Sequence, residues 1–81
     1  MNENEIKILS DQIRAERARN RISQEQMAKA LNISRPTYNE LELHPNKISL
    51  DQGLIINYYL NWNMFDFILS NILQNAIKKG E

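Results

Sequence analysis

Cysteine is absent from this 81-residue sequence, and histidine occurs once, at His44. A chain without cysteine forms no disulfide and offers no thiolate ligand, and one histidine does not supply the ligand cluster of a zinc site. Glycine and proline are almost as scarce, with two residues of each. We therefore expect no metal and no cofactor, and no flexible linker that divides the chain.

Long apolar runs are also missing. No run exceeds three residues, as at Leu54 to Ile56, whereas a helix that crosses a bilayer needs roughly 20. The polar start MNENE lacks the basic n-region of a signal peptide. These features predict a cytoplasmic protein with no membrane contact, folded as a single domain over residues 1–81.

The ten basic and ten acidic side chains cancel, but they are unevenly distributed. Two acidic residues, Glu16 and Glu25, accompany six basic ones between positions 14 and 35: Arg14, Arg17, Arg19, Arg21, Lys29 and Arg35. Such a local excess is typical of a solvated helix face, and it also suits a surface that binds an anionic partner. Charge alone leaves both interpretations open.

Apolar residues recur at helical spacing, and short polar motifs mark the helix ends. The first amphipathic helix carries Ile6, Leu9 and Ile13 and runs to about residue 19. The pair Ser23 and Gln26 is a capping box, so a second helix is expected from residue 24 to about 31. A third helix is expected over residues 35–43, because Ser34 is a good N-cap and Pro36 is tolerated in a first turn.

Two further helices are predicted after the break at His44–Pro45. Ser49 and Gln52 form a second capping box, which opens a fourth helix that ends near residue 60. Gly53 inside this helix indicates the close approach of a neighbour. A fifth helix is expected over about 63–78. The sequence therefore predicts an all-α fold of five helices.

The join between the second and third helices is short, so the two helices must cross steeply. The segment SQEQMAKALNISRPTYNELE, residues 23–42, resembles the helix-turn-helix transcriptional regulators related to the phage lambda and Cro repressors, the XRE family. This resemblance implies a five-helix lambda-repressor-like DNA-binding domain, with the helix-turn-helix core at residues 23–43. It also implies that the third helix lies in the major groove of double-stranded DNA.

The resemblance also implies a role for individual residues. Gln24 would anchor a phosphate, Arg35 would contact guanine, Glu40 would accept from a cytosine amino group, and Pro36 would touch a thymine methyl group. The whole expected DNA-binding set is Gln24, Ser34, Arg35, Pro36, Thr37, Asn39 and Glu40. In the family, the positions of Arg17 and Glu42 hold an ion pair that links the first helix to the third.

Two functions remain open at this stage. The first is a repressor of bacterial or phage origin that binds a palindromic operator as a homodimer. The second is a protein-binding module that acts on another repressor or a toxin, such as an antirepressor or antitoxin, with little DNA binding of its own. The candidate interface for a second subunit is Trp62, Phe65, Ile68, Leu69 and Ile72. No arrangement of nucleophile, base and third group indicates an enzyme.

Overall fold

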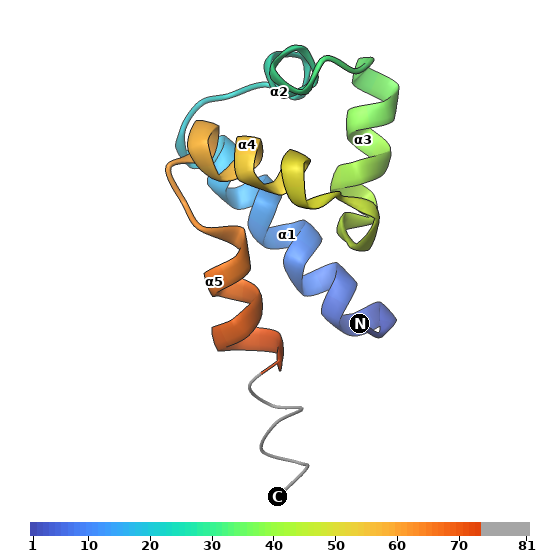
Figure 1. Ribbon diagram of the computed structural model, residues 1–81, viewed down its shortest axis with the longest axis vertical. Helices are drawn as coiled ribbons and strands as arrows, with labels where there is room; N and C mark the ends of the chain where they lie inside the picture. Colours follow the sequence, from blue (N-terminus) through green and yellow to red (C-terminus); the bar gives the residue numbers. More distant parts are fainter. Residues whose placement is uncertain (74–81) are drawn as a thin grey trace, which may run out of the picture.

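The computed structural model describes residues 1–73 of the chain, and all of its regular structure in this range is helical (Figure 1). The elements are α1 (Glu3–Arg19), α2 (Gln24–Leu31), α3 (Arg35–Leu43), the 3₁₀ turn η1 (Pro45–Lys47), α4 (Leu50–Leu60), α5 (Met64–Ile68) and the π-helical segment η2 (Leu69–Leu73). The predicted all-α fold of five helices is confirmed. None of the helices in this range is long and apolar enough to cross a membrane.

Local capping motifs explain where the helices begin. Ser23 and Ser49 each accept a hydrogen bond from the backbone amide three residues later, and the glutamine at that position bonds back to the serine amide. The Ser34 hydroxyl likewise accepts from the amide of Thr37 at the start of α3. At the other end, α2 stops where Asn32 adopts a left-handed backbone with φ of 57°, a conformation that asparagine tolerates.

The core is shared by all the helices. Its buried members are Leu9 and Ile13 from α1, Met27 and Ala28 from α2, Tyr38 from α3, Ile56 and Leu60 from α4, Met64 from α5 and Ile72 from η2. The turn between α2 and α3 is closed by a hydrogen bond of 2.9 Å from the Ile33 amide to the Ala28 carbonyl oxygen. Ala28 has a small side chain, which lets α3 cross close to α2.

The close approach predicted at Gly53 is formed between α4 and α5. A Cβ atom at this position would lie 2.6 Å from Cζ of Phe65 and 2.9 Å from Cε of Met64. Both distances are shorter than van der Waals contact, so a side chain here would force the Phe65 ring and the end of Met64 to move. Gly53 therefore leaves room for these two side chains of α5 against α4.

The predicted fifth helix differs from the structure. The α-helix ends at Ile68, and a π-helical segment follows to Leu73; residues 74–78 of the predicted helix lie outside the described residues. Spacing arguments assume 3.6 residues per turn, and a π-helical turn breaks that period. Ile72, within this segment, is only 1% exposed and belongs to the core, which corrects its assignment to a free interface.

Candidate nucleic-acid interface

Helix α3 stands beside α2 at one end of the molecule (Figure 1). Its inner face is buried through Tyr38, Leu41 and Glu42. Its outer face holds most of the residues expected to meet DNA. Ser34, Arg35, Pro36, Thr37 and Glu40 are exposed, and Asn39 is half-buried. The structure thus leaves the N-terminal half of α3 accessible.

Two helices contribute to one depression on this surface, which is lined by Gln24, Arg35, Pro36 and Asn39. Gln24 is the first residue of α2, and its side-chain amide donates to Oδ1 of Asn39 at 3.0 Å and to Oε1 of Glu42 at 3.3 Å. Sequence spacing did not reveal these two bonds. They fix the start of α2 against the exposed side of α3.

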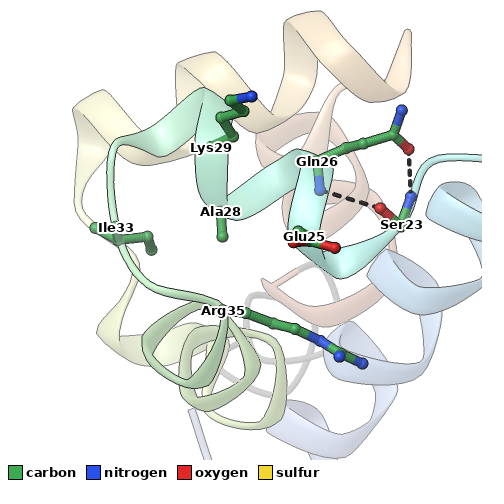
Figure 2. Close-up of a pocket in the computed structure, with 7 residues that line it drawn as sticks. All are labelled: Ser23, Glu25, Gln26, Ala28, Lys29, Ile33 and Arg35. Atoms are coloured by element: carbon green, nitrogen blue, oxygen red, sulfur yellow. Dashed lines mark hydrogen bonds between the residues drawn. The ribbon is translucent and has the colours of Figure 1, made fainter.

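Arg35 also borders a second depression, on the other side of the α3 N-terminus. Figure 2 shows its side chain extending from the start of α3 past the first turn of α2, where Ser23 and Glu25 lie. Within residues 1–73, Arg35 forms no ion pair, and neither do the exposed residues Arg21 and Lys29. These cations are available for phosphate oxygens or base edges.

An ion pair behind the surface joins α1 to the C-terminal end of α3. Arg17 donates from Nε to Oε2 of Glu42 at 3.0 Å and from Nη2 to Oε1 at 2.9 Å. A third bond runs from its Nη1 to the Ile22 carbonyl oxygen at 3.1 Å. The bidentate geometry is the strong form of an arginine–carboxylate pair. The two residues that the resemblance singled out are therefore in direct contact.

Burial of the Arg17–Glu42 pair affects the pKa values of both groups. The Glu42 side chain is only 1% exposed, and burial by itself would raise the pKa of its carboxyl group. Hydrogen bonds from Arg17, with a further contribution from Gln24, outweigh the burial and hold the pKa of Glu42 below its ordinary value. The same hydrogen bond raises the pKa of Arg17. Both groups are charged at neutral pH.

Further residues of α1 complete the cluster around Glu42. Ser10 is buried, and its hydroxyl donates to the Glu42 carbonyl oxygen at 2.6 Å. Arg14 Nε lies 3.9 Å from Oε1 of Glu42. Residues 10, 14 and 17 share one face of α1, and this spacing is the only sequence signal that would have grouped them. The effect is to hold α3 rigidly on α1.

Helices α2 and α3 form a helix-turn-helix pair. The ion pair with α1 holds α3 on its inner side, and the N-terminal half of α3 is exposed. This arrangement defines a DNA-binding helix-turn-helix domain. A model of the helix-turn-helix family matches residues 13–53, about half of the chain, from within α1 to the start of α4. The chain belongs to this XRE-type family, whose members are DNA-binding regulatory domains rather than enzymes. No curated protein and no solved structure matches it.

Proposed function

We propose that this protein is a sequence-specific transcriptional regulator of repressor type, of bacterial or phage origin, which acts in the cytoplasm. It binds a palindromic operator in double-stranded DNA as a homodimer, and α3 is its recognition helix. The observation that carries the proposal is the exposed Arg35, which has no ion pair within residues 1–73, at the first turn of a helix held by the buried Arg17–Glu42 pair. An arginine at the start of a firmly held helix suits readout of a base edge.

Base readout is assigned to the exposed face of α3. Arg35 donates two guanidinium N–H groups, one to O6 and one to N7 of guanine, and Glu40 accepts from a cytosine amino group. Pro36 offers an apolar contact to a thymine methyl group. Thr37 and Asn39 are neighbouring contacts, and Ser34 holds the first turn through its cap.

Phosphate contacts are assigned to the flank of this face. Gln24 begins α2, where unpaired backbone amides favour an anion. The Gln24 side-chain amide makes two hydrogen bonds, and the one to Glu42 is the longer, at 3.3 Å. The N–H group of this longer bond is the easier of the two to turn toward a phosphate oxygen. Arg21 and Lys29, which form no ion pair within residues 1–73, add positive charge from the start and the middle of the α2 region.

The test compares Arg35→Ala with Gln24→Ala on an operator selected from random duplexes. Arg35→Ala should cost about 1–3 kcal/mol on the operator and relax the preference at one base pair in each half-site. Gln24→Ala should weaken binding to operator and random DNA alike, because a phosphate contact carries no sequence information. Fluorescence polarisation with both duplexes measures the difference.

Arg35→Lys is the matched control, because lysine keeps the charge and loses the bidentate geometry. It should retain binding to random DNA and lose the preference for guanine. Thermal melts of all three variants verify that the fold is intact. If the Arg35 variants bind operator and random DNA as the parent does, Arg35 does not read bases.

A second function, binding of another protein such as a repressor or a toxin, is favoured by Glu40. This exposed acid lies on the outer face of α3, with His44 Nε2 3.8 Å from its carboxylate, and negative charge there opposes approach to phosphate. If Glu40→Gln or Asn39→Ala loses a protein partner while Arg35→Ala leaves DNA binding unchanged, this function replaces the first.

A further inference from the structure

The side-chain amides of Gln24 and Asn39 join the first turn of α2 to the accessible side of α3. Nε2 of Gln24 donates to Oδ1 of Asn39 at 3.0 Å and to Oε1 of Glu42 at 3.3 Å. A side-chain amide nitrogen carries two hydrogens, so these bonds use both donors of Gln24. The Gln24 amide is therefore held in one orientation.

Glu42 determines which orientation this is. A carboxylate only accepts hydrogen bonds, and that of Glu42 already accepts two from Arg17, at 3.0 and 2.9 Å. Gln24 must therefore turn its amino group, and not its carbonyl oxygen, toward Glu42. The same amino group faces Asn39, so Asn39 must present its carbonyl oxygen in return.

These contacts leave the amino group of Asn39 without a partner among residues 1–73. The bond that it accepts from Gln24 is the only hydrogen bond of the Asn39 side chain in this range. Asn39 is half-buried and lines one depression with Gln24, Arg35 and Pro36. Its two amino hydrogens are thus available donors on the side of α3 assigned to base readout.

We propose that Asn39 is a specificity-determining residue that reads a base through its amino group alone, because Gln24 occupies its carbonyl oxygen. The inference rests on the proposed function and deepens it by naming the base edge that is selected. An unconstrained asparagine uses its donor and its acceptor together on N7 and N6 of adenine. With its acceptor turned to Gln24, Asn39 suits the acceptors O6 and N7 of guanine or O4 of thymine. Cytosine presents its N4 amino group, which would meet the Asn39 amino group donor to donor.

The orientation of Asn39 is compatible with the phosphate contact assigned to Gln24. A phosphate oxygen, like a carboxylate, accepts hydrogen bonds, so the amino group of Gln24 keeps its direction when one N–H group turns from Glu42 to the DNA. The shorter bond, to Asn39, is retained. One amide can therefore hold a phosphate and orient a base-reading side chain in the same complex.

Operator duplexes that differ at a single base pair test the readout. Asn39→Ala identifies the pair, as the one at which it abolishes the preference. The parent should bind the guanine or thymine duplex about tenfold more tightly than the cytosine duplex. Asn46→Ala is the matched control, because it removes an exposed asparagine amide from η1, and it should leave this preference unchanged. A parent preference for cytosine at this pair, or no altered preference in Asn39→Ala, would overturn the proposal.

Gln24→Ala tests the cause of the selectivity. The freed Asn39 amide can still turn its amino group to guanine, so this contact with the operator is kept, but it can now turn its carbonyl oxygen to cytosine as well. The cytosine penalty should therefore fall from about tenfold to about twofold, in addition to the uniform weakening from the lost phosphate contact. An unchanged penalty would overturn the role of Gln24, while base contact by Asn39 and DNA binding would stand.

Exchange of side-chain amide protons, followed by NMR, measures the orientation without DNA. The Asn39 Nδ2 protons should exchange with water about tenfold faster than the bonded Nε2 protons of Gln24. The reverse order would mean that Asn39 donates to Gln24, and it would overturn the proposal even in a protein that binds its operator. The expected order in a protein that binds no duplex would instead overturn the proposed function, and with it the base readout.

Discussion

Replacement of Arg17 by alanine should lower the free energy of unfolding by about 3–5 kcal/mol, because it removes the bidentate partner of the buried Glu42 carboxylate and leaves only the more distant Arg14. The carboxylate is only 1% accessible to solvent, so water does not replace the lost bonds. The loss is a large share of the 5–15 kcal/mol that stabilises a typical domain. The bond to the Ile22 carbonyl oxygen is lost as well. Urea denaturation followed by circular dichroism measures the change.

Arg19→Ala is the matched control on the same helix. The Arg19 side chain is mostly exposed, and its partner Glu16, although only 13% exposed, keeps a hydrogen bond from Gln12 Nε2, so the removal of Arg19 should change the free energy by less than about 1 kcal/mol. The double variant Arg17→Met/Glu42→Leu should recover much of the loss, since it removes the unpaired charge. Equal denaturation midpoints for Arg17→Ala and Arg19→Ala would contradict a buried, stabilising pair.

A fall in pH should lower the contribution of Glu42 to the free energy of unfolding in the parent protein. In Arg17→Ala the same fall in pH should raise this contribution. The pKa of Glu42 is lowered in the folded state, so its contribution is complete above the unfolded pKa near 4.5 and is lost as the pH falls through the folded pKa. In Arg17→Ala, burial dominates and raises the pKa of Glu42, so the folded state binds the proton more tightly. The destabilisation by this substitution should therefore be smaller at pH 4 than at pH 7, as measured by urea midpoints.

The elements that sequence predicts well here are those set by neighbours three or four residues apart. Ser23, Ser34 and Ser49 each cap the helix expected of them, because a capping bond depends only on the residues of one turn. The left-handed Asn32 is equally local. Helices α2 and α3 consequently begin where the sequence places them.

The remaining features depend on where distant segments pack. Ser10 and Gln24 meet Glu42 across gaps of 32 and 18 residues, and neither contact follows from helical spacing. The exposure of Leu50, Leu54 and Tyr58 on α4 is a similar case, because a helix with apolar residues on several faces gives no indication of which face its neighbours will leave open. The π-helical segment that contains the buried Ile72 is signalled by no pattern in the sequence.

Tyr38 controls how α3 sits on the rest of the domain. Its ring is fully buried in the shared core, on the inner face of the recognition helix. Its hydroxyl makes no hydrogen bond of ordinary geometry within the described part of the chain. Burial, followed by the negative charge of Glu42, raises the pKa of this phenol. The ring therefore packs as an apolar group, and the hydroxyl stays protonated beside the Arg17–Glu42 pair.

Truncation of this ring in Tyr38→Ala should cost about 3–5 kcal/mol, because it opens a cavity between α3 and the core. Tyr38→Phe keeps the ring and should change the free energy of unfolding by about 1 kcal/mol or less, since the lost hydroxyl has no well-formed bond. Tyr58→Ala is the exposed control, since this side chain is 80% exposed, and it should cost about 0.5 kcal/mol or less.

Operator affinity provides the second readout for Tyr38. Tyr38→Phe should bind the operator as the parent does, because the ring and not the hydroxyl sets the position of Arg35, one turn earlier in α3. If Tyr38→Phe is as unstable as Tyr38→Ala, the hydroxyl belongs to the polar cluster of Arg17 and Glu42 instead. In that case α3 is held by a hydrogen-bonded network that reaches from α1 into the core, and the recognition helix owes its position to polar contacts rather than to ring packing.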